Sequence, residues 1–242
     1  MLNSAFNINK LNIPALPVQK VIGFSSNISP LSLVKNNEDS FQKIGDDCLN
    51  FISKLEIKSS NRNVDPADWS YLYMNPIQQK IDQMRLSLNQ VFSRKDKKLS
   101  EYFNAVCEES SKNKIGNCSE QATLTANYIK QKYPDVKVNL VSYLGQISSA
   151  WDDSCSLTRD HCNVILGLPK GFDFSKLGSK ETVESLKNVY MIDAWGGFHS
   201  SLKEGLETVK KMLKLGNQDT VNYFSYADQS CKRNKLINDI NL

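Results

Sequence analysis

The sequence lacks most of the features that mark membrane, nucleotide-binding and nucleic-acid-binding proteins. No stretch approaches the roughly 20 apolar residues that span a bilayer, so we expect no stable membrane insertion. There is no glycine-rich phosphate loop and no nucleic-acid-binding module, and a net charge of +4 does not call for an anionic partner. We therefore expect no nucleic acid among its partners.

Histidine is also scarce, and the cysteine pattern fits neither a disulfide framework nor a metal site. The chain has two histidines and six cysteines in 242 residues. Disulfide frameworks are commonest in small secreted domains, whereas this chain is long and shows no cleavable signal, so we expect reduced thiols. Asp152, Cys155, His161 and Cys162 raise the alternative of zinc, but their spacing matches no common ligand pattern. We expect no metal and no cofactor.

The composition changes near residue 38. Residues 1–37 are rich in Asn, Ser, Ile and Leu, contain three prolines and have no acidic residue. They are expected to form either a loosely ordered tail or a non-cleaved export signal, since starts of this kind resemble those of bacterial effectors that enter host cells. Residues 38–242 are expected to form a single domain.

The first half of that domain has helical periodicity, and the second half has strand periodicity. Apolar residues at helical spacing predict helices over 40–55, 77–92 and 100–111, and a later one over 202–213. Alternating apolar residues predict strands over 136–144, 161–168, 188–194 and 221–226. The expected fold class is α+β, with a helical N-terminal half and a buried, cysteine-bearing helix packed on a mostly antiparallel sheet.

That central helix follows a well-defined N-terminal signal. Gly116 is expected to take backbone angles that other residues resist, and Asn117 is a favoured N-cap. Glu120 can complete a capping box, which makes Cys118 the first helical residue. A thiol there is close to the unpaired N–H groups of a helix N-terminus, which favour a thiolate. The helix carries no charge between Gln121 and Ile129, which predicts burial on most sides.

A thiolate enzyme also needs an imidazole and a group that orients it. His161 opens a predicted strand, and Asp193 lies near the end of the next, with Val189 and Met191 on the same face. If these two strands are neighbours in the sheet, Asp193 can reach His161. Both side chains can then face the N-terminus of the helix that bears Cys118. His199 follows two glycines with no predicted strand and is the weaker base. A structural role for the cysteine and the histidine is the alternative.

These residues resemble the motifs of a known group of enzymes. Gly116-Asn117-Cys118 opening a buried helix, Asp160-His161 opening a strand and Ile192-Asp193-Ala194-Trp195 ending one are similar to papain-like and transglutaminase-like thiol enzymes, in particular the Cys-His-Asp effectors and toxins of pathogenic bacteria. The resemblance covers about residues 100–197. It implies a nucleophile at Cys118, a general base and acid at His161 and an orienting acid at Asp193.

One part of the pattern differs. Papain-type proteases usually carry a Gln several residues before the cysteine as an oxyanion donor, and Lys112 stands at about that place. The backbone N–H of Cys118 can supply one donor, and Asn113 and Gln121 are the candidates for the second. Trp195 is expected either to shield the His–Asp pair from water or to pack as a core residue. The missing Gln favours the transglutaminase-like group.

The resemblance implies acyl transfer through a thioester, without a cofactor. The expected function is an effector-type deamidase or transglutaminase that acts on Gln carboxamides of a host protein, exported without a cleaved signal into the host cytoplasm or otherwise cytoplasmic. A papain-like cysteine protease is the second enzyme hypothesis. A host-protein-binding module that keeps the fold without turnover is the hypothesis of another class.

Overall fold

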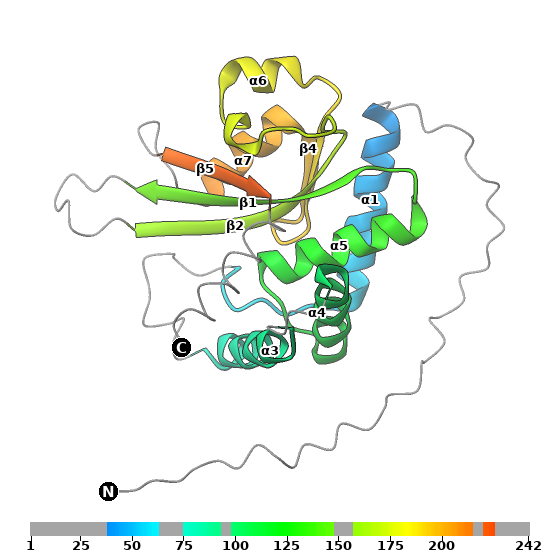
Figure 1. The fold of residues 1–242 in the computed structure, drawn as a ribbon, viewed down its shortest axis with the longest axis vertical. Coiled ribbons are helices and arrows are strands. Elements are labelled where there is room, and N and C mark those ends of the chain that lie inside the picture. The colour runs from blue at the N-terminus through cyan, green and yellow to red at the C-terminus, as the bar shows by residue number, and fades with distance from the viewer. Residues whose placement is uncertain (1–37, 63–74, 93–97, 148–156, 215–219, 226–242) are drawn as a thin grey trace, which may run out of the picture. The chain divides into compact units, whose positions relative to one another are not determined.

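The computed structural model describes residues 38–62, 75–92, 98–147, 157–214 and 220–225. Within them the fold is α+β, as predicted, and is built on an antiparallel sheet (Figure 1). The helices are α1 (Glu38–Leu55), α3 (Pro76–Phe92), α4 (Leu99–Asn113), α5 (Cys118–Lys132), the 3-10 turn η1 (Phe174–Lys176), α6 (Lys180–Ser185) and α7 (Leu202–Met212). The strands are β1 (Val138–Ile147), β2 (Leu157–Leu166), β3 (Tyr190–Asp193), β4 (Phe198–Ser201) and β5 (Thr220–Ser225).

Some expectations concern residues outside these ranges. The predicted tail or export signal at 1–37 and the zinc alternative at Asp152 and Cys155 lie outside the described residues. Among the described helices, none combines the length and apolar character that crossing a membrane requires.

The sheet has the order β4-β3-β2-β1-β5 in the described part of the chain, and all of its neighbouring strands are antiparallel. The β1–β2 register places Tyr143 directly opposite His161. The β2–β3 pairing ends at Val164 and Ile192, so β3 stops as β2 continues towards His161. This difference in strand length leaves the end of β2 open to the helix that approaches it.

Helices cover both faces of the sheet, and each face has its own core (Figure 1). On one face, α1 and α5 pack against Cys162, Val164 and Leu166 of β2. On the other face, α7 and the segment around η1 pack against Ile165 and its neighbours. The predicted alternation is therefore confirmed from Cys162 to Leu166, but the expectation that His161 opens this strand is wrong, because pairing with β1 begins at Leu157. The alternating pattern also places Leu168 on the face of Cys162, Val164 and Leu166, but this residue packs in the second core, because the strand ends at Leu166 and the chain turns.

Burial explains the lack of charge in α5. Its buried residues lie all around the helix, with the sheet on one side and α1 and α4 on others. A lysine or glutamate at the buried positions from Gln121 to Ala126 would lose its hydration. The prediction of burial on most sides is confirmed.

Strand β4 was not expected, and it changes the position of the second histidine. His199 lies on β4, opposite Ile192 of β3, so the expectation that it lies outside a strand is wrong. Its ring accepts or donates hydrogen bonds at both nitrogens, to the Tyr190 hydroxyl at 2.8 Å and to Asp46 of α1 at 2.9 Å. A β-carbon on Gly45 would come within 2.5 Å of this ring. Glycine therefore permits the close contact between α1 and β4.

Candidate active site

Helix α5 begins at Cys118, as the sequence predicted, and Asn117 precedes it in an extended conformation. The Glu120 carboxylate accepts the backbone N–H of Asn117 at 2.9 Å, which forms one half of the capping box. The Asn117 side chain faces the N–H of Glu120 but directs its hydrogen bonds to other groups. Cys118 is 9% exposed and belongs to the buried core on the α5 face of the sheet.

Gly116 is needed for a different reason from the one expected. Its φ is not among the positive values found at other glycines, so special backbone angles are not the cause. A β-carbon at this position would come within 2.7 Å of the Glu120 side chain. The turn before the cysteine therefore needs glycine for space, because Glu120 folds back over it.

His161 and Asp193 form a buried pair. His161 Nε2 lies 2.5 Å from Asp193 Oδ2, and the residues are 2% and 0% exposed. The second carboxylate oxygen of Asp193 accepts the Gly196 N–H at 2.7 Å. Both oxygens of Asp193 are thus engaged, and the carboxylate can hold the imidazole in one orientation.

The same imidazole interacts with Cys118. Burial by itself lowers the pKa of His161, but the charge and hydrogen bond of Asp193, together with a hydrogen bond and charge interaction with Cys118, raise the pKa to about 10. The ring is therefore protonated at neutral pH and carries an N–H on both nitrogens. Because Nε2 is hydrogen-bonded to Asp193, Nδ1 is the ring nitrogen that is left to hydrogen-bond with Cys118. The structure thus brings together the three side chains that the sequence singled out.

Two aromatic rings flank His161. The Trp195 ring meets the imidazole edge-on, with a centroid separation of 5.2 Å, and Tyr143 lies at 6.0 Å. Trp195 donates its indole N–H to Ser59 and Asn61, and the Tyr143 hydroxyl donates to Asn163 at 2.8 Å. These hydrogen bonds fix the rings, and the rings exclude water from the imidazole. Trp195 also packs against the core cluster that contains Cys118, so its position is compatible with both expectations.

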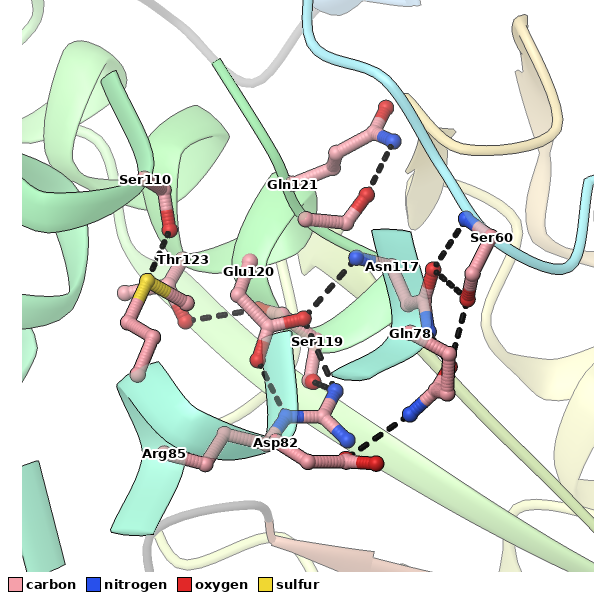
Figure 2. Close-up of polar contacts among 12 residues, drawn as sticks. Ser60, Gln78, Asp82, Arg85, Ser110, Asn117, Ser119, Glu120, Gln121 and Thr123 are labelled. Atoms are coloured by element: carbon pink, nitrogen blue, oxygen red, sulfur yellow. Dashed lines mark hydrogen bonds and ion pairs between the residues drawn. The ribbon is translucent and has the colours of Figure 1, made fainter. Parts of the chain in front are cut away.

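A salt bridge from α3 supports the first turn of α5 (Figure 2). Arg85 donates to both oxygens of Glu120, at 2.8 Å each, and to the Ser119 hydroxyl at 3.2 Å. Burial by itself would raise the pKa of Glu120, but the charge and hydrogen bonds of Arg85, with the Asn117 N–H, hold it below its usual value. Glu120 is therefore a buried anion that connects α3 to the helix start.

A second set of contacts holds Asn117 (Figure 2). Its side-chain oxygen accepts hydrogen bonds from the Ser60 N–H and hydroxyl, at 3.0 Å each, and from the Ser59 hydroxyl at 2.9 Å. Its nitrogen donates to Gln78 of α3 at 3.1 Å. The residue before the nucleophile is thus held from two directions, by α3 and by the segment that follows α1.

Sequence reasoning did not identify Arg85, Gln78, Ser59 or Ser60. One signal was available: a glutamate in the first turn of a helix expected to be buried needs a cation or donors. This requirement does not identify Arg85 as the partner of Glu120, because the chain contains 30 Lys and Arg residues.

Of the two expected oxyanion donors, Asn113 lies away from the turn that holds Cys118, and Gln121 uses one of its two amide N–H groups within that turn. Asn113 is exposed at the end of α4, where its amide donates to the backbone and side-chain oxygens of Glu109. Gln121 is buried in α5, and its amide donates to the Gly116 carbonyl at 3.0 Å (Figure 2). Gln121 therefore supports the turn before Cys118.

Three further cysteines described by the structure are buried thiols. Burial raises the pKa of both Cys48 and Cys107 to about 12, and that of Cys162 well above its usual value. Such thiols are protonated at neutral pH and react slowly. No cluster of three or more potential metal ligands occurs among the residues described. Cys118 is thus distinguished from these cysteines by its contact with a protonated imidazole.

Comparison of the chain with protein-family models, with curated proteins and with solved structures finds no match. The geometry above is therefore the basis on which a function is assigned.

Proposed function

We propose that the protein is a thiol acyltransferase or hydrolase in which Cys118 is the nucleophile, His161 the general acid and base, and Asp193 the residue that orients His161. The observation that carries this proposal is the buried chain of contacts from Cys118 through His161 to Asp193. A nucleophile, a base in hydrogen-bond contact with it and a third group that fixes the base are the arrangement that such chemistry needs.

The reaction would begin with attack of the Cys118 thiolate on a carboxamide carbon. The C–N bond then breaks, the leaving amine takes a proton from His161, and a thioester remains on the sulfur. Water or an amine attacks the thioester while His161 takes up a proton, and the thiolate is regenerated. Hydrolysis gives deamidation, and an amine acceptor gives transamidation.

The proposed substrate is a Gln side chain of a host protein, and the proposed setting is that of an effector protein. Two sequence features support this: the transglutaminase-like order of the motifs and the uncharged, Asn- and Ser-rich composition near the start of the chain. We also propose that the α+β fold is of the papain-like or transglutaminase-like type. Proteolysis uses the same first half-reaction on a peptide bond, so a cysteine protease is the second candidate.

Labelling with iodoacetamide tests the proposed nucleophile. At neutral pH the native protein is expected to label rapidly at Cys118, because it alone among the described cysteines contacts a protonated imidazole. Peptide mass spectrometry after a short exposure gives the site. Cys155 and Cys231 lie outside the described residues, so a variant with both replaced by serine is the matched control. Labelling of Cys118 no faster than that of Cys48 would contradict the proposal and favour a binding module.

Mass spectrometry of host-cell proteins tests the reaction. Treatment with the wild-type protein, compared with Cys118→Ala, is expected to convert a Gln to a Glu, a gain of about one dalton, or to join an amine to it. Cleaved peptide bonds that depend on Cys118 would assign the protein as a protease. Identical products from both samples would remove the enzymatic proposal.

A further inference from the structure

The proposed reaction passes through a tetrahedral intermediate whose oxygen carries a negative charge, and that oxygen needs donors. The backbone N–H of Cys118 lies in the first turn of α5, where N–H groups have no partner within the helix. Several neighbouring side-chain nitrogens already donate to the protein. Asn117 donates to Gln78, Gln121 donates to Gly116, and the Trp195 indole donates to Ser59 and Asn61.

Asn61 differs from these residues. Its side-chain oxygen accepts the Trp195 indole N–H at 3.1 Å and the Ser59 hydroxyl at 2.9 Å. These contacts fix the orientation of the carboxamide, so its nitrogen faces away from both donors. No acceptor for that nitrogen occurs among the residues that the structure describes. Asn61 is partly buried, so it can meet a substrate without being hidden in the core.

The position of Asn61 relates it to both sides of the site. Ser59, which bonds to Asn61, also bonds to Asn117, the residue next to Cys118. Trp195, which bonds to Asn61 on the other side, contacts the His161 ring. The carboxamide is thus attached to the supports of both the nucleophile and the base.

We propose that the Asn61 side-chain nitrogen is the second oxyanion donor and acts together with the backbone N–H of Cys118. This rests on the proposed function. When Cys118 Sγ bonds to the carbonyl carbon, the π-electron pair moves to the oxygen, and the two N–H groups bind the resulting anion. When the C–N bond breaks with a proton from His161, the pair returns to form the thioester carbonyl. Asn61 neither gains nor loses a proton.

Two reagents separate this role from a structural one. Acylation of Cys118 by p-nitrophenyl acetate forms an oxyanion, whereas alkylation by iodoacetamide at a saturated carbon does not. Asn61→Ala and Asn61→Asp are expected to slow acylation about 100-fold, the usual effect of losing one such donor, and to leave the alkylation rate almost unchanged. Asn61→Asp keeps the oxygen that Trp195 and Ser59 require. Asn104→Ala, an exposed asparagine on α4, is the matched control and should change neither rate.

Each other result has a distinct meaning. Unchanged acylation in both Asn61 variants overturns the assignment of Asn61 and leaves the proposed nucleophile intact. A parallel fall in acylation and alkylation also overturns it, because Asn61 would then act by holding Trp195 or Ser59. If the wild-type protein itself is not acylated at Cys118, the proposed function fails, and the role of Asn61 fails with it.

Discussion

At the scale of single residues, the site depends on where one proton resides. The pKa of His161 is raised because its ring interacts with Asp193 through Nε2 and also with Cys118. Burial without these partners would give a neutral ring and an ordinary buried histidine. The raised pKa of His161 therefore depends on the proximity of Asp193 and Cys118, and burial alone does not produce it.

Replacing Asp193 should change the pH dependence of stability. In the wild-type protein the raised pKa of His161 adds stability that is complete below about pH 6.5 and is lost as the pH rises through about 10. Over that interval the folded protein keeps a proton that the unfolded chain releases, so the free energy of unfolding falls with pH. In Asp193→Asn the main charge that holds the proton is absent, and this fall should be smaller.

Urea unfolding at several pH values measures that slope. Asn keeps an oxygen for the Gly196 N–H, so the turn after β3 is retained as far as possible. Asp135→Asn, at an exposed position after α5, is the control for a general loss of charge. Equal slopes in the wild-type protein and Asp193→Asn would show that Asp193 does not hold the proton of His161.

At the scale of elements, the orientation of α5 is set by α3 as well as by the sheet. Arg85 provides the cation for Glu120, which in turn holds the backbone N–H of Asn117 (Figure 2). Helix α3 therefore acts on the nucleophile through the helix start, although it also packs on α4 through its own apolar face. Removing the cation should affect both stability and Cys118.

Arg85→Ala is expected to lower the free energy of unfolding by about 3 kcal/mol, because it leaves the Glu120 carboxylate buried without a cation. Iodoacetamide labelling of Cys118 should slow at the same time. Adding Glu120→Gln removes the unpaired charge, so the double variant should recover part of the lost stability. Gln83→Ala, at an exposed position on α3, is the matched control. Strictly additive effects in this double-mutant cycle would rule out the coupling.

The elements also show which features the sequence could predict. The start of α5 follows from a local signal, its cap, and the existence of β2 follows from alternation, but the strand begins four residues before the predicted His161 because pairing with β1 extends it to Leu157. Strand β4 has four residues, all partly buried, and it exists because it pairs with β3. Its formation depends on a neighbour, which local periodicity cannot reveal. The need for glycine at Gly116 likewise depends on the path of the Glu120 side chain.

At the scale of the whole molecule, the site draws on segments that are distant in the chain. Ser59 and Asn61 follow α1, Arg85 lies on α3, and Trp195 follows β3. The sequence named Cys118, His161 and Asp193 because their residue types and their places in elements limit the choice. Supporting residues such as Ser60 and Gln78 are common types with many equivalents, and only the tertiary arrangement selects them.

The reactivity of Cys118 should therefore be lost together with the fold. With increasing urea, rapid labelling confined to Cys118 is expected to give way to slow labelling at all six cysteines. This change should occur at the same urea concentration as the loss of helix measured by circular dichroism. If rapid labelling disappears at a clearly lower concentration, the site opens before the domain unfolds. The assignment of the site to one cooperative unit would then be wrong.

A short parallel bridge between Lys58 and Ile115 connects two of these segments. Lys58 donates its N–H to the Lys114 carbonyl at 2.9 Å, and its carbonyl accepts the Gly116 N–H at 3.1 Å. The segment that leads to Asn61 and the segment that leads to Cys118 are therefore mechanically joined. A molecule that pulls the first segment aside would displace the proposed oxyanion donor and the nucleophile in one movement.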